Sequence, residues 1–146
     1  MPSTTVLTLD EIKSLVDIGR LIEEIETGFV LYSEGQAKVP PVGFLHFEEP
    51  PGDVHIKYGY LTGDTCYVLK VASAFYENTA LGLPANDGLV LVFNQKTGST
   101  EFILLDEGWL TDMRWLLPAL LLQNIWLLHK FLLLGLLIRA YRQNFS

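Results

Sequence analysis

The sequence predicts an α+β fold in residues 1–114, with one or two N-terminal helices and a mostly antiparallel sheet. Apolar residues recur at helical spacing up to residue 35, and five short β-type runs separated by turn residues follow. Charge marks the end of this domain, because all 17 acidic residues lie in residues 1–114 and none in residues 115–146. With 146 residues, 49% of them hydrophobic, and one cysteine, the chain has room for about one domain and is neither disordered nor a disulfide scaffold.

The first segment has the pattern of an amphipathic helix with a defined start. Thr8-x-x-Glu11 has the form of a capping box, so we expect a helix from about Leu9. Apolar residues continue at helical spacing, acidic residues lie on the other side as a solvated face, and Gly35 has the position of a residue just past a helix C-terminus. The apolar stripe consists of Ile18, Leu21, Ile22, Ile25 and Phe29.

Five β-type runs follow the helical segment. They are residues 42–47, 55–61, 66–72, 88–94 and 100–105. The last two runs are joined by four residues ending in Gly98, which can adopt the positive φ of a hairpin loop, so we expect a hairpin there. Pro40-Pro41 and Pro50-Pro51-Gly52 contain prolines, which lack an amide donor and fix φ, and we expect these segments to separate strands rather than join them.

Composition narrows the function classes. Residues 1–114 are acidic, and their scattered lysines form no basic stripe, so we do not expect nucleic-acid binding through this region. Residues 1–16 have no signal-peptide pattern, so we expect a cytoplasmic protein. Cys66 lies in an apolar run and is expected to be a buried, inert thiol. The histidines, His46, His55 and His129, lack metal-ligand spacing, and no metal site is expected.

Two basic residues are candidates for binding an anion. Lys70 stands in an alternating run in which a strand surrounds the cation with apolar neighbours; the alternative is a surface lysine whose ammonium reaches water. Arg114 closes a stretch in which Thr111 can cap a helix and place the arginine in its first turn. A cation and a helix N-terminus both favour an anion there.

Several short motifs occur in order between residues 70 and 114. They are Lys70-Val71-Ala72-Ser73, Asn78, Gly82-Leu83-Pro84, Thr97-Gly98 and Leu110-Thr111-Asp112-Met113-Arg114. This order resembles the ornithine cyclodeaminase and mu-crystallin family, and the resemblance covers roughly residues 12–114. It implies a dimeric, NAD(P)-dependent enzyme or binding protein with an N-terminal substrate-binding and dimerisation domain and a following dinucleotide-binding domain.

The resemblance also implies roles for individual residues. Lys70 and Arg114 match the residues that hold the substrate carboxylate in that family. The arginine that the family has just after the proline pair is replaced here by Val42, and Lys57 is a candidate to take its place. Fixed cations would orient the α-hydrogen of an amino acid toward a nicotinamide ring. The implied parent activity is the NAD-dependent conversion of L-ornithine to L-proline and ammonia, or a related oxidation or reduction of an amino or imino acid.

Residues 115–146 have two interpretations. The leucine-rich stretch 115–138 has about the length that spans a bilayer, but the central Lys130 costs about 2.5 to 3.5 kcal/mol and makes insertion marginal. In the neighbouring reading frame, the residues up to Leu128 permit Ala-Ala-Ala-Gly-Ala-Ile-Ala-Ala-Lys-Tyr-Leu-Ala-Pro, which resembles the helix that follows the arginine in the family. Residues 134–144 permit, apart from one position, a sequence close to the family's glycine-rich phosphate turn.

We therefore expect that one base was lost near codon 115 and that residues 115–146 are an out-of-frame, non-native tail. The Rossmann domain would then be missing, since no G-x-G-x-x-G follows a strand: Gly108 stands alone and Gly135 lies in the leucine run. On this interpretation the chain is a truncated, inactive family member that forms a homodimer and binds no NAD(P) itself. The alternative is a non-enzymatic binding module with a C-terminal membrane anchor.

Overall fold

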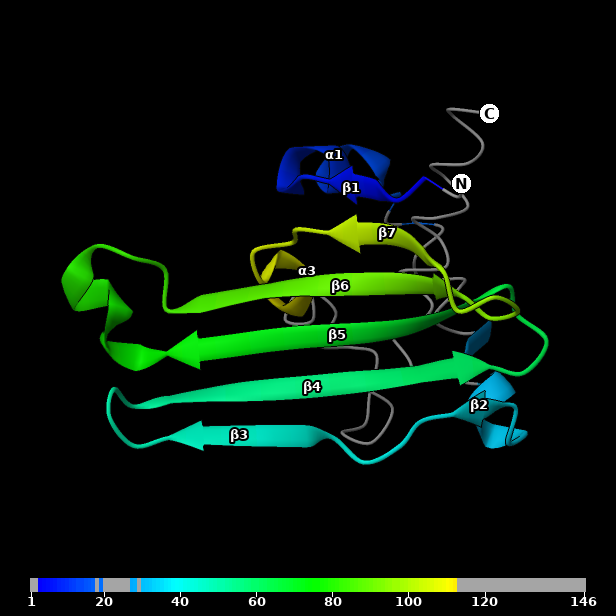
Figure 1. Cartoon of the computed structure of the whole chain (residues 1–146), viewed down its shortest axis with the longest axis horizontal. Helices are drawn as coiled ribbons and strands as arrows, with labels where there is room; N and C mark the ends of the chain where they lie inside the picture. The colour runs from blue at the N-terminus through cyan, green and yellow to red at the C-terminus, as the bar shows by residue number, and fades with distance from the viewer. Residues whose placement is uncertain (1–2, 18, 20–26, 29, 113–146) are drawn as a thin grey trace.

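The computed structural model describes residues 3–17, 19, 27–28 and 30–112. Its elements are β1 (Thr5–Leu7), α1 (Leu9–Leu15), β2 (Ala37–Lys38), β3 (Gly43–Phe47), β4 (Gly52–Leu61), β5 (Cys66–Phe75), the 3-10 helix η1 (Tyr76–Leu81), β6 (Asn86–Asn94), β7 (Thr100–Leu104) and α3 (Trp109–Asp112). The sheet has the order β1-β7-β6-β5-β4-β2, and β3 also pairs with β4 (Figure 1). Every pairing is antiparallel except that of β1 with β7. The described part therefore has the predicted α+β class and mostly antiparallel sheet.

The five predicted strands all form, and two further strands accompany them. The hairpin between β6 and β7 is confirmed, because Gly98 has a φ of +71° and its N–H donates to the Asn94 carbonyl at 2.9 Å. The unpredicted strands, β1 and β2, are only three and two residues long. β1 pairs in parallel with β7, at the other end of the described chain, so local pattern alone does not reveal it.

The second proline pair lies in a hairpin loop. β3 and β4 are antiparallel neighbours, and Phe47 pairs with Gly52 across the loop that contains Pro50 and Pro51. A loop residue donates no hydrogen bond to the ladder, so proline is tolerated there. The expectation that Pro50-Pro51 separates strands is therefore wrong, although Pro40-Pro41 does lie between β2 and β3.

The first helix begins where the sequence predicts and ends earlier. The backbone N–H of Thr8 donates to the Glu11 carboxylate at 2.8 Å, and the Thr8 hydroxyl donates to the same oxygen at 2.7 Å. These bonds, the backbone one foremost, hold the pKa of Glu11 below its ordinary value. Val16 is extended, with ψ 115°, so α1 ends before it and is not one helix through residue 35. Gly35 does follow a helical stretch with φ +73°, whereas most of the apolar stripe lies outside the described residues.

One face of the sheet, called the inner face here, carries the buried core. Successive residues of a strand point to opposite faces, so every second residue of β5, β6 and β7 contributes. The core consists of Leu7, Ile12, Cys66, Val68, Val90, Val92, Phe102, Leu104 and Leu110. Ile12 comes from α1 and Leu110 from α3, so both helices pack against this face. Cys66 is buried here, as predicted.

The opposite face, called the outer face here, is apolar as well. By the same alternation, its residues on β4 and β5 include Val54, Ile56, Tyr58, Tyr60, Tyr67, Leu69 and Val71. None of them belongs to the buried core cluster, and Tyr58 and Tyr60 are exposed. An antiparallel sheet with one solvated face normally alternates apolar and polar residues. An apolar outer face is therefore typical of a contact surface.

Candidate functional site

Two lysines face each other on the inner face of the sheet. The register pairs Lys57 of β4 directly with Lys70 of β5, and opposite residues in such a pair have Cβ atoms about 4.5 to 5.5 Å apart. Lys70 is 3% exposed and Lys57 is 6% exposed. On its other side Lys70 is paired with Val90, a core residue of β6. The alternating run therefore places Lys70 in the core-facing row, and the alternative of a surface lysine is excluded.

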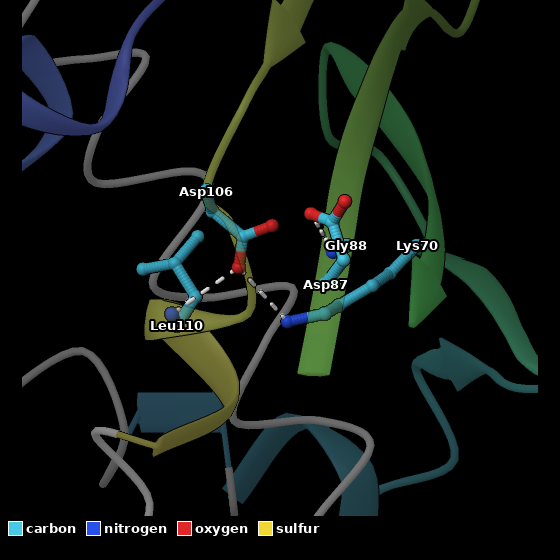
Figure 2. A network of polar contacts seen from close by, with 5 residues as sticks. All are labelled: Lys70, Asp87, Gly88, Asp106 and Leu110. Atoms are coloured by element: carbon cyan, nitrogen blue, oxygen red, sulfur yellow. Dashed lines mark hydrogen bonds and ion pairs between the residues drawn. The ribbon is translucent and has the colours of Figure 1, made fainter. Parts of the chain in front are cut away.

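A buried carboxylate lies beside Lys70. Asp106 Oδ2 is 3.3 Å from Lys70 Nζ, and the two side chains are 0% and 4% exposed (Figure 2). The same oxygen accepts a hydrogen bond from the backbone N–H of Leu110 at 3.2 Å. The other oxygen, Oδ1, is buried and has no hydrogen-bond partner in the described part of the chain. One carboxylate thus links β5, the end of β7 and the start of α3.

A short turn connects the end of β7 at Leu104 to the start of α3 at Trp109. Glu107 and Gly108 have φ values of +50° and +79°, a left-handed conformation that glycine adopts freely and other residues rarely adopt. The chain then enters α3 at Trp109, whose N–H donates to the Asp106 carbonyl at 2.7 Å. The carbonyl and the carboxylate of Asp106 together accept the hydrogen bonds of two N–H groups at the start of α3, as a cap does.

This geometry corrects one prediction about the helix start. Thr111 is not the N-cap of α3, because Asp106 accepts hydrogen bonds from the first turn and Thr111 lies inside the helix. Arg114, the second candidate for anion binding, lies outside the described residues. Sequence reasoning missed Asp106, although an acidic residue four positions before Leu110, with Gly108 between them, is a usable signal for a capped helix start.

The buried charged residues of the described chain form an arrangement suited to an anion. They are Lys57, Lys70 and Asp106. An ammonium group has three donors, so Lys70 can hold Asp106 and a second acceptor at the same time. Charge-assisted hydrogen bonds are stronger where water is excluded. Two buried ammonium groups beside one carboxylate could bind and orient a small anion.

A second polar cluster lies on β3, β4 and η1, and it is more exposed. The Tyr76 hydroxyl donates to Asp53 Oδ2 at 2.5 Å, and His46 Nδ1 is 3.2 Å from Asp53 Oδ1. The Tyr76 and His46 hydrogen bonds lower the pKa of Asp53, and the carboxylate in turn raises the pKa of Tyr76. No group of three or more His, Cys, Asp or Glu in the described ranges could hold a metal ion.

The turn between β7 and α3 contains a single glycine, Gly108, whereas the phosphate-binding turn of a dinucleotide-binding fold contains three. A Cβ at Gly108 would stand 3.6 Å from Asn86 Cβ, so the turn packs against the start of β6.

A cavity of about 470 Å³ lies at the β6–β7 hairpin and is lined by residues such as Thr5 and Thr97. Its lining includes neither Lys57 nor Lys70.

Within the described ranges, no helix has the length and apolar character needed to cross a membrane. The leucine-rich stretch 115–138, on which both interpretations of the tail depend, lies outside those ranges.

Comparisons with known proteins give one consistent relationship. The model of the ornithine cyclodeaminase/mu-crystallin family matches residues 3–115. An uncharacterized cyclodeaminase of Sinorhizobium fredii is 30% identical over 116 residues, which are 78% of this chain and 35% of that protein. The Thermococcus litoralis Δ1-pyrroline-2-carboxylate reductase, solved with NADH and L-proline, has a TM-score of 0.69 and 29% identity over 76% of this chain and 34% of its own.

A third relative is a lysine cyclodeaminase whose structure concerns recognition of L-lysine, L-ornithine and L-2,4-diaminobutyric acid. Its TM-score is 0.64 at 26% identity, covering 76% of this chain and 35% of that one. The chain therefore spans about a third of the length of the relatives that it matches. Because the family model covers most of the sequence and the fold agrees, this chain belongs to the ornithine cyclodeaminase/mu-crystallin family.

Proposed function

We propose that residues 3–112 form the substrate-binding and dimerisation domain of a protein that converts L-ornithine to L-proline and ammonia with NAD, or that oxidises or reduces a related amino or imino acid. The observation that carries this proposal is the pair of buried, facing lysines on the inner face, with Asp106 beside one of them. Membership of the family supports it. The L-proline bound to one solved relative and the amino acids recognised by the other support a ligand that carries a carboxylate.

In this proposal Lys70, Lys57 and Arg114 bind the substrate carboxylate, with Lys57 taking the place of the arginine that is absent after Pro40-Pro41. Cations from two strands can engage both carboxylate oxygens, which fixes the direction of the α-carbon. Because both lysines are enclosed, a ligand enters only when neighbouring side chains move, and association should be slower than diffusion.

A second domain would supply the NAD site, and NAD would accept or donate the hydride there. The relatives are about three times as long as the matched region, which supports this proposal. We further propose that the coding sequence of that domain continues in the neighbouring reading frame after Arg114. The nucleotide sequence across codons 110–146 tests this, because bases that do not read as Ala-Ala-Gly-Ala-Ile-Ala-Ala-Lys in that frame contradict it.

The outer face of β3, β4 and β5 is our candidate for contact with a second copy of the chain. Leu45, Tyr58 and Tyr60 are exposed apolar or aromatic residues on these strands, and homodimer interfaces are more apolar than an ordinary surface. Analytical ultracentrifugation should give a dimer for the parent chain and a monomer for Tyr58→Lys. A parent chain that sediments as a monomer contradicts the proposed dimer.

Titration of the chain with L-proline and with L-prolinamide, which lacks the carboxylate, tests the binding site. Loss of one hydrogen bond to a charged group is worth about 1.5 to 3 kcal/mol, so Lys70→Met and Lys57→Met should each weaken L-proline binding by about 10-fold to 150-fold. The matched control is Lys96→Met, which removes an exposed lysine at the β6–β7 hairpin. Equal binding of the two ligands, or unchanged binding in Lys70→Met, would contradict the proposal.

A further inference from the structure

We propose that Asp106 is a positioning residue of the substrate site, whose carboxylate fixes the Lys70 ammonium and the start of α3 in one arrangement. This inference rests on the proposed function and deepens it. The Asp106 side chain is fully enclosed, and its Oδ2 is already engaged by Lys70 and by the Leu110 N–H, so we assign it no direct contact with the ligand. It acts instead through Lys70, by keeping the ammonium in one place for the substrate carboxylate.

A capping role alone does not account for this carboxylate. A neutral amide oxygen would accept the hydrogen bond from Leu110 equally well, and asparagine is as good a cap as aspartate. Asp106 instead places a carboxylate in the core while its Oδ1 has no hydrogen-bond partner in the described residues, an arrangement that is costly. Oδ1 lies near Gly88, where an added Cβ would stand 3.5 Å from it. The charge itself is therefore the feature to explain, and the cation beside it is Lys70.

The contact joins segments that are distant in the sequence. Asp106 is 36 residues from Lys70, and a single oxygen, Oδ2, serves both the Lys70 ammonium and the Leu110 N–H (Figure 2). Displacing this oxygen would release the ammonium and the helix start together. Two other charged residues lie nearby along the strands: Lys57 opposite Lys70, and the exposed Asp87, whose Oδ1 accepts the Gly88 N–H at 2.7 Å.

Four variants of the full 146-residue chain, labelled with ¹³C-lysine, separate positioning from stability. Asp106→Asn keeps the shape and the acceptor for Leu110 but removes the charge. Lys70→Met removes the ammonium, the double variant combines the two changes, and Asp87→Asn is the matched control at an exposed acid. The first measurement is whether the two ε-methylene protons of Lys70 have separate NMR signals without ligand, as they do in a held side chain. The second is the affinity for L-proline.

We expect separate ε signals in the parent chain and in Asp87→Asn, and merged signals in Asp106→Asn. L-proline should bind about tenfold more weakly to Asp106→Asn, whereas the same change in the Lys70→Met background should alter affinity by less than about twofold. Separate signals in Asp106→Asn, unchanged affinity in that variant, or an equal loss of affinity in the Lys70→Met background would each overturn the proposal.

Two further measurements test the proposal if a variant does not fold or if the substrate assignment fails. If Asp106→Asn does not fold, the parent chain is labelled with ¹³C-aspartate instead, and the ¹³Cγ signal of Asp106 should shift on addition of L-proline and not of L-prolinamide; no shift would overturn the proposal. If the parent binds both ligands equally, the proposed function fails and the substrate role of Asp106 fails with it. In that case the ε signals still show whether Asp106 holds the ammonium, so the two failures are distinguishable.

Discussion

Replacing Asp106 with alanine measures what the buried ion pair contributes to folding. The variant leaves the Lys70 ammonium in the core without this carboxylate, 4% exposed and far from full hydration. Breaking a buried pair in this way costs about 3 to 5 kcal/mol, and the lost hydrogen bond to Leu110 adds about 1 kcal/mol. The sum, about 4 to 6 kcal/mol, approaches the whole stability of a small domain, about 5 to 15 kcal/mol.

Urea unfolding followed by circular dichroism measures this loss. Adding Lys70→Met to Asp106→Ala should recover several kcal/mol, since the double variant no longer buries the Lys70 ammonium without the Asp106 carboxylate. Asp87→Ala, at an exposed acid on β6, is the control and should change stability by less than about 0.5 kcal/mol. Additive losses in the double variant would refute the buried pair as the cause.

Three further predictions follow from other parts of the chain. Gly88→Ala should lower the thermal midpoint, because the new Cβ would stand 2.9 Å from the Val71 carbonyl oxygen; an unchanged midpoint contradicts this. Asp53→Asn should destabilise the chain at pH 7 but not at low pH. The hydrogen bond from Tyr76, foremost, holds the pKa of Asp53 below its ordinary value, so the stability that the ionised carboxylate contributes is lost as the pH falls through the lowered pKa. A difference in melting temperature that does not depend on pH would be evidence against it. A chain ending at Arg114 should be more soluble than the whole chain, since residues 115–146 are leucine-rich and contain no acidic residue; equal light scattering from both would contradict this.

The sequence predicts the strands well because their signals are local. Period-two alternation and turn residues such as Gly98 lie within a few positions of each strand. Lys70 could be placed by the same alternation, since its neighbours Val68 and Val90 show which row faces the core once the strands are known. β1 escaped prediction because its partner, β7, lies at the far end of the described chain.

The site itself depends on register and on long-range contacts. Lys57 faces Lys70 only because β4 and β5 pair in one register, and a one-residue slip would move one lysine to the other face. Asp106 follows β7 and is 36 residues from Lys70, so their contact depends on how β5, β6 and β7 pair. The residues around Asp106 indicate a helix start, but no local signal shows that Lys70 lies beside it.

A crystal structure of this chain with L-proline bound is the most direct measurement of whether the facing lysines hold a substrate carboxylate. We predict a carboxylate oxygen within about 3.2 Å of Lys70 Nζ, with the Asp106 contact to Lys70 retained and Lys57 Nζ within reach of the same carboxylate. L-proline bound elsewhere, or bound with its carboxylate directed away from both lysines, would contradict the proposed substrate site.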